Sequence, residues 1–312
     1  MPFKTIYSND LSNVKIRLIF CRAKFNKRIS CNKCGSYRIC KYSQRQFRCQ
    51  NCWTKFSITS HTWLNRTRWP LRFWYEIAWC FVLGHAAHKA HRVLKTKDSS
   101  GCWLAYQAIR KAILSDSLVN RPIFTGTCEI DESYYGGQFK NLRKSTRAAF
   151  RAAGLAKRGR GAKNRKQPVF GIYKRNGKVY LDLISDATKT ELIPKVKRTI
   201  EPGSTVCSDE HTSYAQLVGL GYIHQVVNHG QQEYVVDDWH INGLEGFWGL
   251  SKTNMHTYKG IRKLNWIYYL KEMEWRYNHR QLDFENQSLM IIKLLMSYKI
   301  KISYRKEVSR LT

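Results

Sequence analysis

Acidic residues are scarce in this chain. Only 22 Asp and Glu stand against 54 Lys and Arg in 312 residues, which gives a formal net charge of +32 at pH 7. Small domains stay soluble at net charges of about 2–8, so this excess argues against a protein that is merely basic. We therefore expect the partner of the chain to be a polyanion.

The chain also lacks a long apolar run. Met1 to Leu18 has no continuous apolar core of the kind found in a signal peptide, and the longest apolar region, Phe73 to Leu83, is short and contains Glu76. This pattern predicts an intracellular protein without a membrane span. No concentrated amphipathic tract is present, and the basic residues are interleaved with 10 Trp and 18 Tyr. Nucleic acid therefore fits better than a membrane surface as the polyanion.

Disorder is excluded by composition, since 43% of the residues are hydrophobic and 312 residues can build one large or several small cores. In an intracellular chain, the ten cysteines indicate thiols and metal ligands rather than disulfides. Cys31-x-x-Cys34 and Cys49-x-x-Cys52 are separated by 14 residues. Two such pairs at this distance are typical of a four-cysteine zinc ribbon, in which the metal replaces a hydrophobic core. Cys40 lies between the pairs and is a spare thiol in this interpretation.

The predicted ribbon is rich in basic and aromatic side chains. Either these side chains contact DNA, or the ribbon is a module that docks to another protein. These residues are Lys33, Tyr37, Arg38, Lys41, Tyr42, Arg45, Phe47, Arg48, Trp53 and Lys55.

Helical spacing follows the ribbon. Apolar residues recur at helical intervals from Pro70 onward, a second helix is predicted over 85–94, and a third opens near Asp98 after the short polar break 95–97. Basic residues lie near this break, so the segment is either a helix-turn-helix that reads a DNA groove or a helical hairpin that serves packing.

A mixed α/β pattern begins near Ile123. A β-prone run reaches Asp131 and is followed by glycines, and Thr205 to Ser208 forms a second predicted strand that ends at Asp209. Between them, two predicted strands flank an Asn-Gly turn at 176–177. A helix predicted over 190–200 contains Pro194, which places its expected start late in that segment.

Three acids are arranged along this pattern, because Glu245 lies in a helix predicted over 239–256. Asp131, Asp209 and Glu245 are therefore candidates to converge and hold two divalent metals beside a phosphate. Glu132 and Glu210 follow the two aspartates and are expected to point to the opposite face of the sheet. The order of predicted strands and helices is that of the ribonuclease H-like fold.

Residues 140–166 carry 11 Lys or Arg and no acid. This composition predicts a loop that orders on a phosphate backbone, although a localisation signal or an undirected charged loop has the same composition. The candidate DNA-binding residues of this loop are Arg158, Arg160, Lys163, Arg165 and Lys166.

Five motifs in order resemble the transposases of insertion-sequence family 1595, also called ISXO-like, which are related to Merlin elements. The motifs are the two cysteine pairs, Glu129-Ile-Asp-Glu-Ser-Tyr-Tyr-Gly-Gly137, Ser208-Asp-Glu-His-Thr-Ser-Tyr214, His240-Ile-Asn-Gly-Leu-Glu-Gly-Phe-Trp248 with Lys252, and Trp275-Arg-Tyr-Asn-His-Arg280. They span roughly residues 28–282.

The resemblance implies a DDE-type transposase that binds double-stranded DNA, namely the terminal inverted repeats of an insertion sequence and a target. It implies an α/β, ribonuclease H-like catalytic core preceded by a zinc ribbon and a helical region, with Mg²⁺ or Mn²⁺ and Zn²⁺ as cofactors. A homodimer or higher oligomer on DNA, in the bacterial cytoplasm or nucleoid, is also implied. The expected segments are a basic lead-in (1–30), the ribbon (31–60), a helical DNA-binding region (61–122), the catalytic domain (123–285) and a C-terminal tail (286–312).

By the resemblance, Asp131 and Asp209 are the first two acids of the site. Members of the family have either Glu or Asn at the third position, and this chain offers both Glu245 and Asn242; we expect Glu245, because a carboxylate compensates more cationic charge. Lys252 lies about two helical turns after Glu245 and resembles the basic residue that follows the third acid. A nuclease or resolvase that cuts without joining, and a catalytically silent DNA-binding protein, remain as alternatives.

Overall fold

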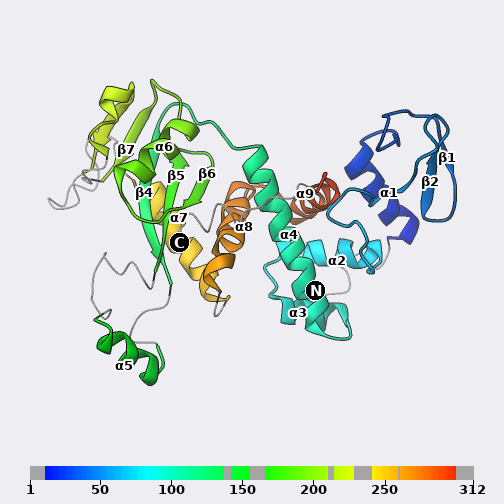
Figure 1. The fold of residues 1–312 in the computed structure, drawn as a ribbon, viewed down its shortest axis with the longest axis horizontal. Helices are drawn as coiled ribbons and strands as arrows, with labels where there is room; N and C mark the ends of the chain where they lie inside the picture. The colour runs from blue at the N-terminus through cyan, green and yellow to red at the C-terminus, as the bar shows by residue number, and fades with distance from the viewer. Residues whose placement is uncertain are drawn as a thin grey trace. The chain divides into compact units, whose positions relative to one another are not determined.

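The computed structural model describes residues 11–136, 142–154, 166–209, 214–227, 241–258 and 261–299. The chain forms two compact units (Figure 1): unit 1 is Met1–Val119 with His279–Ile302, and unit 2 is Asn120–Asn278 with Ser303–Thr312. Among the described helices, none combines the length and the apolar character that a membrane crossing needs. Glu210 and four of the candidate DNA-binding residues, Arg158, Arg160, Lys163 and Arg165, lie outside the described ranges.

Unit 1 combines a small sheet with helices. Its elements are α1 (Asn13–Phe25), β1 (Ile39–Lys41), β2 (Gln46–Cys49), β3 (Lys55–Ser57), α2 (Leu71–Val82), α3 (Ala87–Leu94), α4 (Ser99–Val119) and α9 (Phe284–Met296). The helices predicted at 70, 85–94 and 98 are thus confirmed as α2, α3 and α4. Asp98 begins α4 by accepting a hydrogen bond from the backbone N–H of Ser100 at 2.8 Å.

Helix α9 completes the core of unit 1, although the sequence offered no assignment for it. It packs against α1, α2 and α4, and its residues Ile291, Ile292 and Leu295 are fully buried. Asp283 caps its first turn by accepting the Asn286 N–H at 2.7 Å. The last helix among the described residues is therefore part of the unit that the N-terminal residues begin.

Unit 2 is built on a five-stranded sheet. Its elements are β4 (Cys128–Tyr135), α5 (Lys144–Ala152), β5 (Gln167–Lys174), β6 (Val179–Leu183), α6 (Lys189–Thr199), β7 (Thr205–Ser208), η3 (Val218–Leu220), β8 (Ile223–Val226), α7 (Asn242–His256), η5 (Lys263–Asn265) and α8 (Trp266–Asn278). The strands lie in the order β6-β5-β4-β7-β8. Strand β5 is antiparallel to β4 and β6, whereas β4, β7 and β8 are parallel to one another.

Helices cover both faces of this sheet. On one face, Ile130 and Ile172 belong to a buried cluster with Leu192 and Val196 of α6. On the other face, α7 packs against β4 and β5. Alternation along β4 sends Asp131 to the α7 face and Glu132 to the α6 side, where Glu132 accepts a hydrogen bond from the hydroxyl of the buried Tyr214. The expectation that Glu132 faces away from Asp131 is confirmed.

The expected late start of the helix around Pro194 is wrong. Helix α6 begins at Lys189 and contains Pro194 in its interior. Proline removes one backbone hydrogen bond from the helix. However, Leu192, Ile193 and Val196 are buried against the sheet, and burial of three aliphatic side chains contributes more, at about 1.5–3 kcal/mol each.

Side chains of α8 pair with the edge strand β6. Asn278 Oδ1 accepts the Val179 N–H at 2.8 Å, and Asn278 Nδ2 donates to the Val179 carbonyl at 2.9 Å. Two residues along, Glu274 Oε2 accepts the Leu181 N–H at 2.7 Å. These bonds occupy backbone groups that an exposed edge would offer to another strand. Through Asn278, the motif Trp275-Arg-Tyr-Asn-His-Arg280 therefore helps to cover the edge strand β6.

Candidate functional site

Asp131 lies in the middle of β4, directly across from Gly171 of β5. Because Gly171 has no side chain, the indole of Trp248 from α7 can occupy that position. A Cβ built on Gly171 would lie only 2.5 Å from Cζ2 of that ring. From there Trp248 Nε1 donates a hydrogen bond to Asp131 Oδ2 at 3.0 Å. The glycine thus permits the contact that orients the first candidate acid.

The first turn of α7 is fixed to the sheet by a buried acid. Glu129, two residues before Asp131 and on the same face of β4, has no exposed surface. Its Oε2 accepts the backbone N–H of Leu244 at 2.8 Å, and its Oε1 accepts from Arg175 Nε at 3.4 Å. A carboxylate at a helix N-terminus stabilises the helix through its unpaired N–H groups and dipole. Gly243 permits the approach, since a Cβ there would lie 2.2 Å from the Tyr173 ring.

A second contact anchors α7 farther along. The Tyr135 hydroxyl at the end of β4 donates to Ser251 Oγ at 2.9 Å. Glu129, Asp131 and Tyr135 lie on one face of β4 and contact successive turns of α7. The helix that carries Glu245 is therefore held in a fixed position relative to Asp131.

The structure brings Asp209 and Glu245 close enough to Asp131 for their charges to act on it. Burial, against the lowering effect of its hydrogen bonds and with a smaller contribution from the negative charges of Asp209 and Glu245, raises the pKa of Asp131 to about 6. Asp209 follows β7, which pairs in parallel with β4 through Glu129 and Cys207. That register places Asp209 beside Asp131. Glu245 is exposed in the first turn of α7.

The backbone at the end of β7 is braced next to Asp209. The Ser208 hydroxyl donates to the Asp209 carbonyl at 2.9 Å and contacts His224 Nε2 of β8 at 2.8 Å. Burial lowers the pKa of His224, which favours the neutral imidazole as the partner of the hydroxyl. The candidate acid is thus attached to an ordered strand end.

The three candidate acids offer oxygen donors of the kind that hard divalent cations prefer. Carboxylate oxygens are the donors that Mg²⁺ and Mn²⁺ prefer. A cation bound next to Asp131 would stabilise its ionised form and so lower its raised pKa. The oxygens of the three acids are more widely spaced than a closed metal cage requires. Within the described ranges, only the four cysteines have potential ligand atoms that all lie within 4.8 Å of one another.

Lys252 lies near the acids, on the same side of α7 as Glu245. Burial lowers the pKa of its ammonium group, the charge of Asp131 acts in the opposite direction, and Lys166 lowers it further. Lys166 is the described member of the predicted DNA-binding set, so its charge reaches the site. Asn242, the alternative third ligand, is the first residue of α7 and is exposed.

Sequence reasoning missed Glu129, Gly171, Gly243 and the polar role of Trp248. Trp248 counted only as an apolar residue of its helix. A usable signal was the glycine inside a β-prone run at 171, since glycine in a strand interior often marks a close approach by another group.

The four cysteines form a compact group in unit 1. Cys31 Sγ and Cys52 Sγ are 3.5 Å apart, and Cys34 Sγ and Cys49 Sγ are 3.6 Å apart. Tetrahedral ligands at a Zn–S distance of about 2.3 Å would be about 3.8 Å apart, so the spacing fits zinc. The Lys33 N–H points to Cys31 Sγ and the Asn51 N–H to Cys49 Sγ, each at 3.4 Å, which stabilises thiolates. Cys40 stays outside this group.

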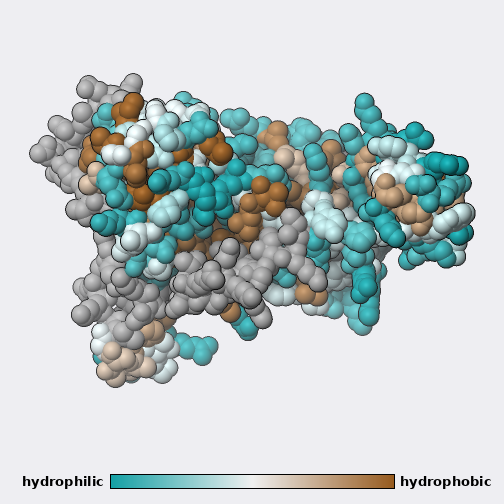
Figure 2. All heavy atoms as spheres, turned by 45° about the horizontal axis from the view of Figure 1, so that its top comes forward, coloured by the Kyte–Doolittle hydropathy of each residue, from teal (hydrophilic) through white to brown (hydrophobic). Residues whose placement is uncertain are grey.

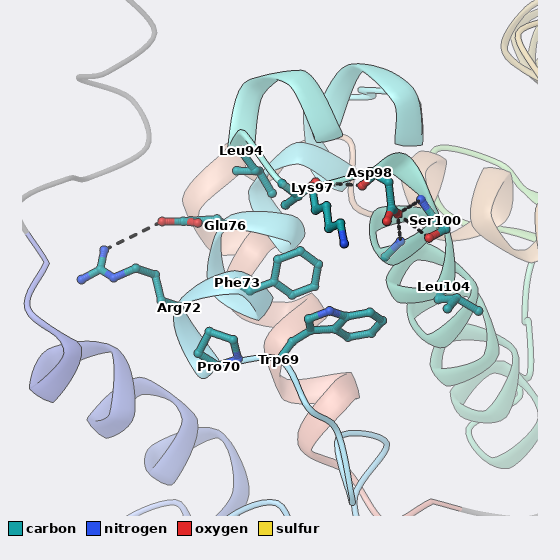
Figure 3. Close-up of a pocket in the computed structure, with 12 residues that line it drawn as sticks. Trp69, Pro70, Arg72, Phe73, Glu76, Leu94, Lys97, Asp98, Ser100 and Leu104 are labelled. Atoms are coloured by element: carbon teal, nitrogen blue, oxygen red, sulfur yellow. Dashed lines mark hydrogen bonds and ion pairs between the residues drawn. The ribbon is translucent and has the colours of Figure 1, made fainter.

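A separate pocket of about 490 Å³ lies in unit 1 between the start of α2 and the turn before α4 (Figure 3). Trp69, Phe73 and Leu104 give it an apolar lining. Of its two acids, Glu76 pairs with Arg72 at 3.9 Å and Asp98 caps α4. The lining contains none of the three candidate acids, so this pocket is separate from the candidate site.

Comparison with known proteins gives three matches. A family model described as the ISXO2-like transposase domain matches residues 123–278, half of the chain. An uncharacterised transposase-like protein of Haemophilus influenzae is 29% identical over 119 residues, which cover 38% of this chain and 94% of that protein. An uncharacterised protein in the transposable element ISH50 of Halobacterium salinarum is 22% identical over 283 residues, covering 88% of this chain and 93% of that protein. No solved structure matches the chain significantly.

Proposed function

This chain belongs to the ISXO2-like transposase family, and from that premise we propose that it is the DDE transposase of an insertion sequence. It binds the ends of the element as double-stranded DNA, cleaves them and joins the 3′ ends to target DNA. The observation that carries this proposal is the packing that brings Asp131, Asp209 and Glu245 together: β4 pairs in parallel with β7, and α7, which carries Glu245, contacts β4 through the hydrogen bond from Trp248 to Asp131.

The proposed ribonuclease H-like core is supported by the sheet. Its strand order is β6-β5-β4-β7-β8, with β5 alone reversed. The central strand β4 and its parallel neighbour β7 deliver Asp131 and Asp209, and α7 delivers Glu245 across the same face. The site would thus combine an acid within the central strand, an acid directly after its parallel neighbour and an acid on a late helix.

Each residue has a distinct task in the proposed reaction. Asp131 is the central ligand, and the Trp248 indole fixes one of its oxygens. Asp209 and Glu245 would each provide a further carboxylate ligand on either side of Asp131. Two divalent cations, when bound, supply Lewis-acid activation of the attacking oxygen and stabilise the leaving oxygen. Lys252 and Lys166 stabilise the phosphate by positive charge, and orientation of the hydroxyl and phosphate for in-line attack supplies further rate acceleration. No covalent enzyme intermediate is needed.

Hydrophilic residues cover much of the face shown in Figure 2, as the net charge of +32 leads one to expect. Such a charge attracts duplex DNA through counterion release. Assembly as a dimer or larger oligomer on two element ends is part of this proposal.

The deciding experiment is a strand-transfer assay with pre-cleaved element ends and a target plasmid, with and without Mg²⁺. We expect the parent chain to join DNA ends only when Mg²⁺ is present. Asp131→Asn and Asp209→Asn should each abolish joining, while binding to duplex DNA persists. Glu201→Gln is the matched control, because Glu201 is an exposed acid that precedes β7 at its other end. Cleavage without joining would instead assign a nuclease or resolvase, and binding without cleavage would assign a catalytically silent DNA-binding protein.

A further inference from the structure

The outer face of the zinc ribbon carries two cations and two exposed aromatic rings. Cross-strand pairing aligns Cys40 of β1, Arg48 of β2 and Lys55 of β3, so these side chains project from one face of the sheet. The opposite face, with Phe47 and Phe56, packs into the ribbon core. Tyr42 and Trp53 adjoin the outer face. We call Tyr42, Arg48, Trp53 and Lys55 the outer face below.

Each ring of the outer face is paired with a cation. The Arg48 guanidinium lies over Trp53 at 4.4 Å from the ring centroid, and Lys55 Nζ lies over Tyr42 at 4.0 Å. Lys55 also donates to the Tyr42 hydroxyl at 2.6 Å. The rings nevertheless remain in solvent, since Trp53 is 62% exposed and Tyr42 is 47% exposed. Ring area therefore remains open to a planar ligand.

Trp53 has a left-handed backbone conformation that is unfavourable for any residue with a side chain. Its φ is +59°, whereas the equivalent position after the other cysteine pair is Gly35, with a φ of +73°. Both N–H groups close the same turn, at 3.0 Å from the carbonyls of Cys49 and Cys31 respectively. Glycine is the residue that adopts this conformation without cost. A large exposed tryptophan in its place disfavours folding and contributes little to the core.

The cations of the outer face also have no carboxylate close to them in the sequence. Arg48 and Lys55 are direct cross-strand partners, and like charges in such positions destabilise a sheet. No Asp or Glu occurs between Leu11 and Tyr75 to neutralise them. In addition, Nε of Arg48 is shielded from solvent and has no hydrogen-bond partner. A strained backbone position and two adjacent cations thus coincide on one small surface.

We propose that the outer face binds unpaired nucleotides of a DNA strand, with bases stacked on Trp53 and Tyr42 and phosphate oxygens at Arg48 and Lys55. Anionic phosphate relieves the charge pair, and the flat face of a base matches an exposed ring. In a duplex, neighbouring bases cover these faces, and the backbone offers charge but no ring surface. The proposal rests on the proposed function and extends it, because it specifies that the ribbon binds single-stranded DNA.

The test measures fluorescence anisotropy of the full-length, zinc-loaded chain with a labelled oligothymidine and, separately, with a labelled duplex. Trp53→Gly removes the ring and suits the backbone, so we expect about a tenfold loss of single-strand affinity with zinc content and melting temperature maintained or increased. Duplex affinity should change less than about twofold, because phosphate contacts elsewhere carry it. Lys55→Gln should reduce the slope of log affinity against log salt for the single strand by about 0.7, as expected for one lost phosphate contact.

Tyr37→Ala is the matched control. Tyr37 belongs to the same ribbon, is 56% exposed and has its own stacked cation, Arg28, but it is outside the three strands. Its loss should leave single-strand affinity unchanged. Unchanged single-strand affinity in Trp53→Gly, or an equal loss on duplex DNA, would overturn the proposal. Joining by the same preparations is measured in parallel, so a failure of the outer face is distinguished from a failure of the transposase assignment.

Discussion

Replacement of Gly171 by alanine tests how the sheet and α7 together position Asp131. The added Cβ would lie 2.5 Å from Cζ2 and 2.6 Å from Cη2 of Trp248, and 3.1 Å from Leu244 Cδ1. Carbon atoms rest at about 3.5–4.0 Å, so the indole must withdraw by about 1 Å. Overpacking of this kind typically costs about 1–3 kcal/mol.

The withdrawal also affects the candidate site directly. It separates Trp248 Nε1 from Asp131 Oδ2, now at 3.0 Å, and shifts the helix that carries Glu245. A displacement of about 1 Å can lower a rate about 100-fold, so Gly171→Ala should join DNA ends about that much more slowly. In thermal unfolding, the same variant should melt a few degrees lower, at about 2–4 °C per kcal/mol for a unit of this size.

Two further variants make this prediction specific. Gly246→Ala is the control on α7, because a Cβ there meets nothing within 4 Å; it should raise helix stability by up to about 1 kcal/mol and leave joining unchanged. Trp248→Phe combined with Gly171→Ala shortens the clashing ring, so it should recover stability but not the Asp131 hydrogen bond. Gly171→Ala with parental melting and parental joining would refute the reasoning.

Four more predictions concern the candidate acids, the zinc ribbon and the basic segment 140–166. Because Asp131 has a folded pKa of about 6 and an ordinary value of 3.8, the unfolded state ionises at lower pH than the folded state; the metal-free chain should therefore lose on the order of 3 kcal/mol relative to Asp131→Asn as pH rises from about 3 to about 7, and flat relative stability would contradict the pKa. Glu245→Gln should abolish Mg²⁺-dependent joining with DNA binding intact while Asn242→Ala only weakens it, and the reverse result would move the third ligand to Asn242. Cys34→Ser should release zinc and unfold the ribbon while unit 2 stays folded; elemental analysis should find one zinc in the parent chain, and a metal-free parent with a folded ribbon would refute the assignment. Joint neutralisation of Arg158, Arg160, Lys163, Arg165 and Lys166 should flatten the salt dependence of duplex binding, and an unchanged slope would assign that segment another task.

Local patterns in the sequence were sufficient for several features. The spacing of Cys31, Cys34, Cys49 and Cys52 predicted the sulfur cluster, because a metal knuckle is formed by a few neighbouring residues. The Asn-Gly pair predicted the β5–β6 hairpin, and Asn176 adopts a positive φ of 56° in its turn, a conformation that Asn tolerates better than most residues. Strand alternation placed Asp131 and Glu132 on opposite faces. The roles of the three acids as metal ligands remain predictions.

The tertiary structure alone decided how the candidate site is held. Glu129 meets the first turn of α7 across 115 residues, and Trp248 meets Asp131 across 117. No local period encodes such contacts, because they depend on which face of a distant helix packs on the sheet and on the space left by Gly171. For the same reason, the sequence did not predict that α9 packs in unit 1 or that Asn278 bonds to β6. Sequence determined which chemical groups are present at strand and helix ends, and packing determined which of them meet.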